Sequence, residues 1–205
     1  MGPSGRFAYV AVPSCSSAFE GRSALASTQV FASRALVGAL TDPFPLDAPA
    51  YQLGDARSPW TSLGSEVSDL CPWDLHDEDG WVVSRIWSNA AAARDREPCR
   101  PAPDDEVFSV ETEPATTRTG KRGETLTWTL RGFTTTPRAD WTIAIVPSNG
   151  NVFVQTLLDQ STMNAGRTAT VSLTIPKDVA ADSYTSFLVA SSDGARTHYW
   201  PAAVV

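Results

Sequence analysis

The chain has 205 residues, of which 42% are hydrophobic, and it carries a formal net charge of −7 at pH 7. This length suits one large domain or two small ones, and the apolar fraction excludes a disordered chain. The negative charge argues against non-specific nucleic-acid binding, which depends on basic patches. No apolar run approaches the roughly 18 residues of a membrane-spanning helix.

The first half predicts mixed secondary structure. Residues 7–12, FAYVAV, predict a strand, because the run is shorter than the roughly 7–15 apolar residues of a signal peptide. Residues 24–41 predict a helix capped by Ser23 or Ser27, and its apolar residues at helical spacing are Leu25, Ala32, Leu36, Ala39 and Leu40. Residues 44–65 predict a long loop, residues 80–90 a strand, and residues 91–99 a short helix or turn.

A change of composition predicts a domain boundary near residue 104. Pro98, Pro101 and Pro103 stiffen a polar segment, and residues 104–106 are all acidic. The predicted domains are therefore 1–104 and 105–205.

The second half predicts only strands and turns. Seven runs alternate with a period of two: 106–114, 124–133, 140–148, 151–159, 168–176, 183–193 and 197–205. The segments between them carry Gly, Asn or Asp, which tolerate the backbone of tight turns. The pattern predicts an all-β sandwich of immunoglobulin type, although the Cys–Trp–Cys pattern is missing because no cysteine follows Cys99.

Three motifs in the first half carry a resemblance to a known family. They are LTDPFP at 40–45, GSEVSDLC at 64–71, and VVSRIWSNAAAA with a later PC at 82–99. In order and spacing they resemble the secreted bacterial zinc metallopeptidases of zincin type, some of which append a β-sandwich domain. The resemblance implies a helix that bears the zinc ligands, followed by the GxEIGDLC and WSN segments.

The catalytic positions that the resemblance implies are eroded in this chain. The first zinc ligand, a His, falls on Arg34, the general-base Glu on Ala35, and the Glu one helical turn after the His on Gly38. Zinc chemistry needs ligands on one helix face and a carboxylate that takes a proton from the bound water. We therefore expect no catalytic residue, no metal and no other cofactor. Glu66 and Asp69 remain as vestigial candidate ligands, or they bond backbone amides in a loop.

The other candidate residues favour structural roles. Acidic residues 74–80 do not follow the EF-hand order, so a solvated loop is favoured over a calcium site. His76 and His198 lie in different halves, without a second ligand at metal spacing. The tryptophans of the first half, at 60, 73, 81 and 87, are interpreted as packing residues rather than a sugar site. Cys71 and Cys99 are predicted to form a disulfide, and Cys15 is a spare thiol or a link to another chain.

The sequence thus predicts a truncated α+β zincin-like remnant followed by an immunoglobulin-like sandwich. The predicted function is that of a non-catalytic, extracellular or cell-surface binding or assembly protein, although no signal peptide is visible. A metal-dependent hydrolase and an inactive fragment of a larger one remain alternatives. An unpaired edge of the strand at 7–12, and Val30 and Val37 lying off the leucine stripe, predict a protein partner or a homo-oligomer.

Overall fold

The computed structural model of the protein describes residues 8–14, 19, 21–44, 47, 58–60, 66–71, 74–100, 106–147 and 155–205. The chain divides into two compact units. The first unit comprises residues 1–52, 64–92 and 98–101, and the second comprises 53–63, 93–97 and 102–205. The boundary near residue 104 stays a prediction, since residues 53–63 and 93–97 group with the second unit. None of the described helices is both long and apolar enough to span a membrane.

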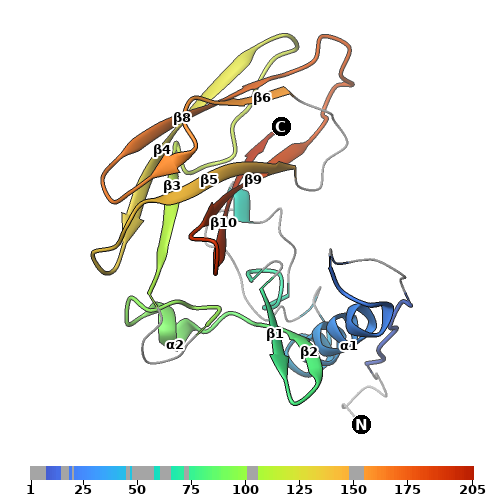
Figure 1. Ribbon diagram of the computed structural model, residues 1–205. Helices are drawn as coiled ribbons and strands as arrows, with labels where there is room; N and C mark the ends of the chain where they lie inside the picture. The colour runs from blue at the N-terminus through green and yellow to red at the C-terminus, as the bar shows by residue number, and fades with distance from the viewer. Residues whose placement is uncertain are drawn as a thin grey trace. The chain divides into compact units, whose positions relative to one another are not determined.

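The first unit packs one helix against one hairpin. Helix α1 (Ala24–Thr41) has the predicted bounds, and the Ser23 side chain caps it by accepting a hydrogen bond from the Ala26 amide at 3.1 Å. Strands β1 (Leu75–Glu78) and β2 (Trp81–Ser84) pair antiparallel, and α1 lies beside them (Figure 1). A second, short helix is α2 (Asn89–Ala92). Predicted loop residues 74–80 therefore contain a strand and a tight turn, because Asp79 and Gly80 adopt positive φ angles of 48° and 81°.

The face that α1 buries differs from the predicted one. Val30 is fully buried with Ala26 and Val82, whereas Leu36 and Leu40 are 55% and 81% exposed. Small side chains let α1 approach β2 closely. At one such position the Ser33 hydroxyl accepts a hydrogen bond from the Ser84 amide at 3.0 Å. The helix is apolar on several sides, so its sequence period did not select the buried face.

The strand predicted at residues 7–12 is wrong for the described part of that segment. Residues 8–14 have no regular structure and most of them are exposed. The run is too short to bury an apolar face, and no described strand pairs with it. The strand predicted at 80–90 is also shorter than expected. It ends at Ser84, which pairs with Leu75, the first residue of β1.

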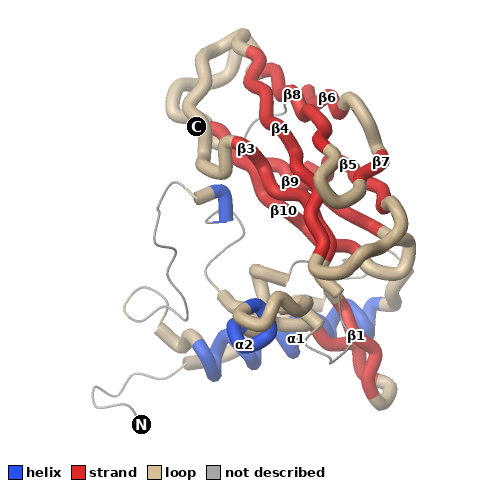
Figure 2. Tube along the Cα trace, turned by 90° about the vertical axis from the view of Figure 1, so that its left-hand side faces the viewer, coloured by secondary structure: helices blue, strands red, loops and turns tan. Residues whose placement is uncertain are grey.

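The second unit contains two four-stranded sheets, which form a β-sandwich. One sheet has the order β3-β4-β8-β6 and the other the order β10-β9-β5-β7 (Figure 2). The strands are β3 (Phe108–Glu113), β4 (Thr125–Thr134), β5 (Trp141–Pro147), β6 (Gln155–Leu158), β7 (Thr162–Met163), β8 (Thr168–Thr174), β9 (Thr185–Ser192) and β10 (Thr197–Val204). All seven predicted strands are present, and the additional two-residue β7 is too short to show a period.

The sandwich core comes from the alternating residues of both sheets. Leu126, Trp128 and Leu130 point inward from β4, as their spacing predicts. The Trp128 and Phe187 rings meet edge to face across the two sheets, with centroids 5.4 Å apart. This pair joins the sheets in a domain that contains no cysteine.

Two residues from the first half of the sequence complete the second unit. Trp60 packs edge-on against Trp200, with ring centroids 5.3 Å apart. Glu97, 1% exposed, lies with its Oε2 2.8 Å from Nδ1 of the half-buried His198. A buried carboxylate needs such a partner because burial removes its hydration. The segment 93–97 is therefore fastened to β10.

We expect residues 105–205 to fold alone, and a 93–205 fragment to be more stable. The shorter fragment should give a cooperative melt and a β-rich circular dichroism spectrum. The longer one, with Cys99→Ser, should be more stable to urea by about 1–3 kcal/mol, because it keeps the close contact between the buried Glu97 carboxylate and the half-buried His198 imidazole. Glu97→Ala in the longer fragment is the matched control and should remove the gain. A disordered or helical spectrum for 105–205 would contradict the prediction.

Candidate functional site

The candidate site lies in the first unit, where the C-terminal half of α1 meets residues 66–71. Those residues form a tight turn that is closed by its own hydrogen bonds. The Asp69 amide donates to the Glu66 carbonyl oxygen at 2.9 Å, and the Glu66 amide donates to Oδ2 of Asp69 at 3.1 Å. Cys71 ends the turn and forms the predicted disulfide with Cys99. The Trp87 amide donates to the Val67 carbonyl oxygen at 3.2 Å and ties the turn to the chain after β2.

Arg34 joins α1 to this turn. Its Nη2 donates to Oδ1 of Asp69 in a half-buried ion pair, and its Nη1 lies 3.5 Å from the Ser68 carbonyl oxygen. Asp69 therefore makes the backbone bond that the sequence left as one alternative; the other alternative, a vestigial metal ligand, stays a prediction. It accepts a backbone amide within the loop, and it faces the position to which the resemblance assigns a metal ligand. The group at that position is the positively charged guanidinium of Arg34.

Glu66 occupies the space beside Gly38. A Cβ atom built at position 38 would lie 3.0 Å from Cδ and from both carboxylate oxygens of Glu66. Real Cβ atoms seldom come that close to another atom, so the absence of a side chain on Gly38 lets the carboxylate lie against the helix backbone. The structure thus brings Arg34, Gly38, Glu66 and Asp69 together. Ala35, half-buried on the same helix, has only a methyl side chain and makes no polar side-chain contact with them.

Asp42 is a buried acid that the sequence did not single out as a candidate. It is 5% exposed and follows the last residue of α1, where its amide donates to the Gly38 carbonyl oxygen at 2.7 Å. Among the described residues neither of its carboxylate oxygens has a hydrogen-bond partner. Its position four residues after Gly38 was the available signal, because residues four apart share a helix face.

Burial, together with the neighbouring carboxylates, raises the pKa of Glu66. Burial contributes most, and the neighbouring charges of Asp69 and Asp42 add to it. Arg34 and a hydrogen bond from Ser68 act in the opposite direction but do not outweigh them. Within the part of the chain that the structure describes, no group of three His, Cys, Asp or Glu side chains is arranged to hold a metal ion.

The other candidate residues take part in separate interactions. Asp77 pairs with Arg22, with oxygen–nitrogen distances of 2.7 and 2.8 Å, and Asp74 pairs with Arg100 at 3.0 Å. The acids of residues 74–80 are thus partly engaged by arginines. His76 lies 3.0 Å from Arg85 through its Nδ1.

The tryptophans likewise lie in separate environments. Trp81 is 62% exposed, and the Trp87 indole nitrogen donates to Asn89 at 2.9 Å. Trp60 packs in the second unit, as described above, and Trp73 lies outside the described residues, as does Cys15.

Comparison with known proteins gives weak structural similarity and no match to a family. No protein-family model matches the chain, and no curated protein matches it. Among solved structures, the chain is similar to the crystal structure of domains 4 and 5 of the S-layer protein SbsC, with a TM-score of 0.35 and 13% sequence identity. The similarity covers 49% of this chain and 47% of that one, so this chain spans about half the length of that structure.

Proposed function

We propose that this protein is a non-catalytic relative of the secreted zincin-type metallopeptidases and acts as an extracellular binding or assembly protein. One observation carries the proposal: the Arg34 guanidinium pairs with Asp69 on the helix face where the resemblance implies zinc. Arginine cannot lose its proton in a protein, so its positive charge is permanent. A cation at that place would meet repulsion from Arg34 and would compete with it for Asp69.

The remaining positions supply no substitute for the lost groups. Metal-assisted hydrolysis requires a general base beside the metal-bound water, and Ala35 has no ionisable group. Gly38 offers no ligand, and its space is taken by Glu66. Asp42 and Glu66 are carboxylates without a neighbouring imidazole or thiolate among the described residues of the site. These features support a role in binding rather than in peptide hydrolysis.

We expect the purified protein to contain no stoichiometric zinc and to cleave no casein-type substrate. Elemental analysis and a fluorescent casein assay, each with and without chelator, measure this. The variant Arg34→His/Ala35→Glu/Gly38→Glu should also stay inactive, because a side chain at 38 must displace the Glu66 carboxylate. Chelator-sensitive cleavage by the natural chain, with one zinc per chain, would overturn the proposal.

The extracellular assignment is supported by the disulfide between Cys71 and Cys99. Such bonds persist in oxidising compartments and are rare in the reducing cytosol.

The second unit has the strand order expected of an immunoglobulin-type sandwich. The sheets β3-β4-β8-β6 and β10-β9-β5 correspond to the two sheets of that fold, and Trp141 provides a buried tryptophan on the third strand. The edge strand β7 is an addition. The order supports the immunoglobulin-like assignment, in a fold that commonly serves binding rather than catalysis.

We expect the chain to self-associate through the exposed leucines of α1. Leu25, Leu36 and Leu40 are 55% to 81% exposed and lie on one side of the helix, opposite buried Gly38. Light scattering at micromolar concentration should report a dimer or a larger species, and Leu36→Glu/Leu40→Glu should shift it to the monomer. Ala24→Glu, which adds an acid at an exposed position on another side of the helix, is the control for added charge.

Of the two valines that lie off the leucine stripe, Val30 is not a suitable site for that test. A charge at fully buried Val30 would unfold the helix packing rather than dissociate an oligomer. A monomer at all concentrations, with the leucines unchanged, would contradict the assembly role.

A further inference from the structure

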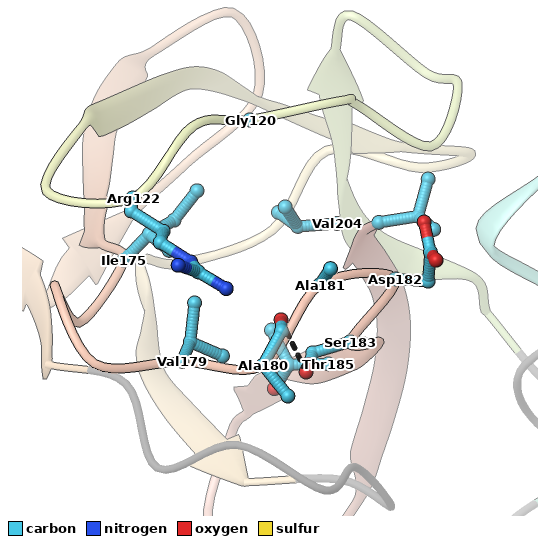
Figure 3. Close-up of a pocket in the computed structure, with 11 residues that line it drawn as sticks. Gly120, Arg122, Ile175, Val179, Ala180, Ala181, Asp182, Ser183, Thr185 and Val204 are labelled. Carbon is cyan, nitrogen blue, oxygen red and sulfur yellow. Dashed lines mark hydrogen bonds between the residues drawn. The ribbon is translucent and has the colours of Figure 1, made fainter.

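A hollow at one end of the sandwich has the features of a small anion site. It has a volume of about 120 Å³ and lies within the second unit (Figure 3). Its walls are the β3–β4 loop, the loop before β9, and the end of β10. Its apolar surface comes from Ile175, Val179, Ala180, Ala181 and Val204, and Arg122 reaches over it from the β3–β4 loop.

The walls of the hollow are held by backbone hydrogen bonds. The Gly120 amide donates to the Val205 carbonyl oxygen at 3.1 Å, and the Gly123 amide donates to the Ile175 carbonyl oxygen at 3.0 Å. A Cβ at position 120 would lie 2.2 Å from Cδ1 of Ile175, so a side chain there would displace that methyl group from the hollow. On the facing loop, the Ser183 hydroxyl donates to the Ala180 carbonyl oxygen at 2.9 Å. A site with walls fixed in this way is largely formed before a ligand binds.

Positive charge gathers at this hollow in a protein whose net charge is negative. The chain has two lysines, and both are close in sequence to lining residues: Lys121 lies between Gly120 and Arg122, and Lys177 lies two residues after Ile175. The Lys177 stem lies against Gly123, because a Cβ at 123 would be 3.3 Å from Cγ of Lys177. Arg122 is exposed and has no hydrogen bond or ion pair with any described residue. Its guanidinium is thus available to a ligand.

The nearby acids do not neutralise this charge by direct pairing. Oε2 of Glu124 accepts the Lys121 amide at 2.7 Å and so closes its own turn. Asp182, which has a positive φ of 56°, lies at the far side of the hollow from Arg122 (Figure 3). Asp178 is exposed next to Lys177, and no ion pair joins it to a described residue.

We propose that the hollow binds a short aliphatic carboxylate, with the chain on the apolar surface and the carboxylate on Arg122. The volume is well below the roughly 300–1,000 Å³ of a site for drug-sized molecules, so it suits one short branched chain. A guanidinium and a carboxylate match in charge and in bidentate geometry. The same chemistry is offered by a free short-chain acid and by the terminal residue of a peptide that ends in valine or leucine.

The test is a titration of the full-length chain, followed by amide chemical shifts. Isobutyrate should shift amides of residues 118–124 and 179–185, with a dissociation constant on the order of millimolar, as expected for so few atoms. Isobutyramide, which has the same shape without the charge, should bind at least about tenfold more weakly. N-acetyl-L-valine is the peptide-terminus probe: tighter binding than isobutyrate assigns the natural ligand to peptide termini, and weaker binding assigns it to free acids.

Two variants locate the site. Arg122→Gln should weaken isobutyrate binding at least about tenfold, and Ala181→Leu should abolish it by filling the hollow. Arg167→Gln, an exposed arginine paired with Asp140, is the matched control and should leave binding unchanged. The proposal is overturned if isobutyrate produces no shifts in these loops, if isobutyramide binds equally well, or if Arg122→Gln binds like the natural chain.

Discussion

Replacing Arg34 with methionine is expected to destabilise helix α1 by about 2 kcal/mol. The variant leaves Asp42, Glu66 and Asp69 close together without the Arg34 guanidinium that pairs with Asp69. Breaking a buried pair from one side costs roughly 3–5 kcal/mol, and partial exposure of Arg34 and Asp69 reduces that figure. Amide hydrogen exchange of α1 measures the effect locally, without requiring the two units to melt separately.

Two further variants make the Arg34 prediction specific. Arg34→Met/Asp69→Asn should recover at least about half of the loss, because it removes the stranded charge together with its partner. Arg131→Met removes an exposed arginine that pairs with Glu111 and Glu113, and it should change stability by less than about 0.5 kcal/mol. Equal exchange protection in Arg34→Met and the natural chain would show that the ion pair does not hold the helix.

The pH dependence of α1 stability follows from the raised pKa of Glu66. The folded unit binds a proton at Glu66 more readily than the unfolded chain does, so protonation favours folding. The stabilisation is complete below the unfolded pKa of about 4.3 and is lost as pH rises through the higher folded value. The loss in Arg34→Met should therefore be greatest at neutral pH and smaller near pH 5. Glu66→Gln should remove this pH dependence.

Removing the disulfide is expected to have the largest effect on the first unit. Cys71 and Cys99 are 28 residues apart, and closing such a loop contributes about 3–4 kcal/mol in the chain-entropy model. Cys71→Ser/Cys99→Ser should lower the midpoint of first-unit unfolding in urea. It should also loosen the turn that presents Glu66 and Asp69 to α1, because Cys71 ends that turn.

The second unit provides the internal control for the disulfide prediction. It has no cysteine in its sandwich, so a reductant should leave its unfolding transition unchanged while it destabilises the first unit. Peptide mapping of secreted protein should find Cys71 and Cys99 joined. Two free thiols after secretion would contradict both the link and the extracellular assignment.

Local patterns predicted the elements of this protein better than they predicted their contacts. The bounds of α1 and the seven long strands follow from helical spacing, the Ser23 cap and strict alternation, which depend on neighbouring residues. The buried face of α1 was predicted wrongly, since leucines and valines occur on several sides. What decides it is the packing at small residues: the Glu66 carboxylate lies against Gly38, and the Ser84 amide donates to the Ser33 hydroxyl.

The candidate site was predicted in its members but not in its chemistry. The sequence assigned Arg34, Gly38, Glu66 and Asp69 to one place only through the resemblance, and the structure brings them together in the first unit. That Arg34 takes Asp69 as its partner, and that Glu66 fills the space at Gly38, depend on tertiary packing between residues far apart in the chain. The pair Glu97–His198 was missed for the same reason.

The contact between Gly38 and Glu66 also constrains how this sequence can change over evolutionary time. Any side chain acquired at position 38 meets the Glu66 carboxylate at 3.0 Å, so Glu66 must give way first or together with it. An acidic side chain at 38 would in addition bring a fourth carboxylate to Asp42, Glu66 and Asp69. Substitutions at 38 and 66 are therefore expected to be coupled: a side chain acquired at 38 requires the Glu66 carboxylate to move, and a shorter residue at 66 removes that requirement.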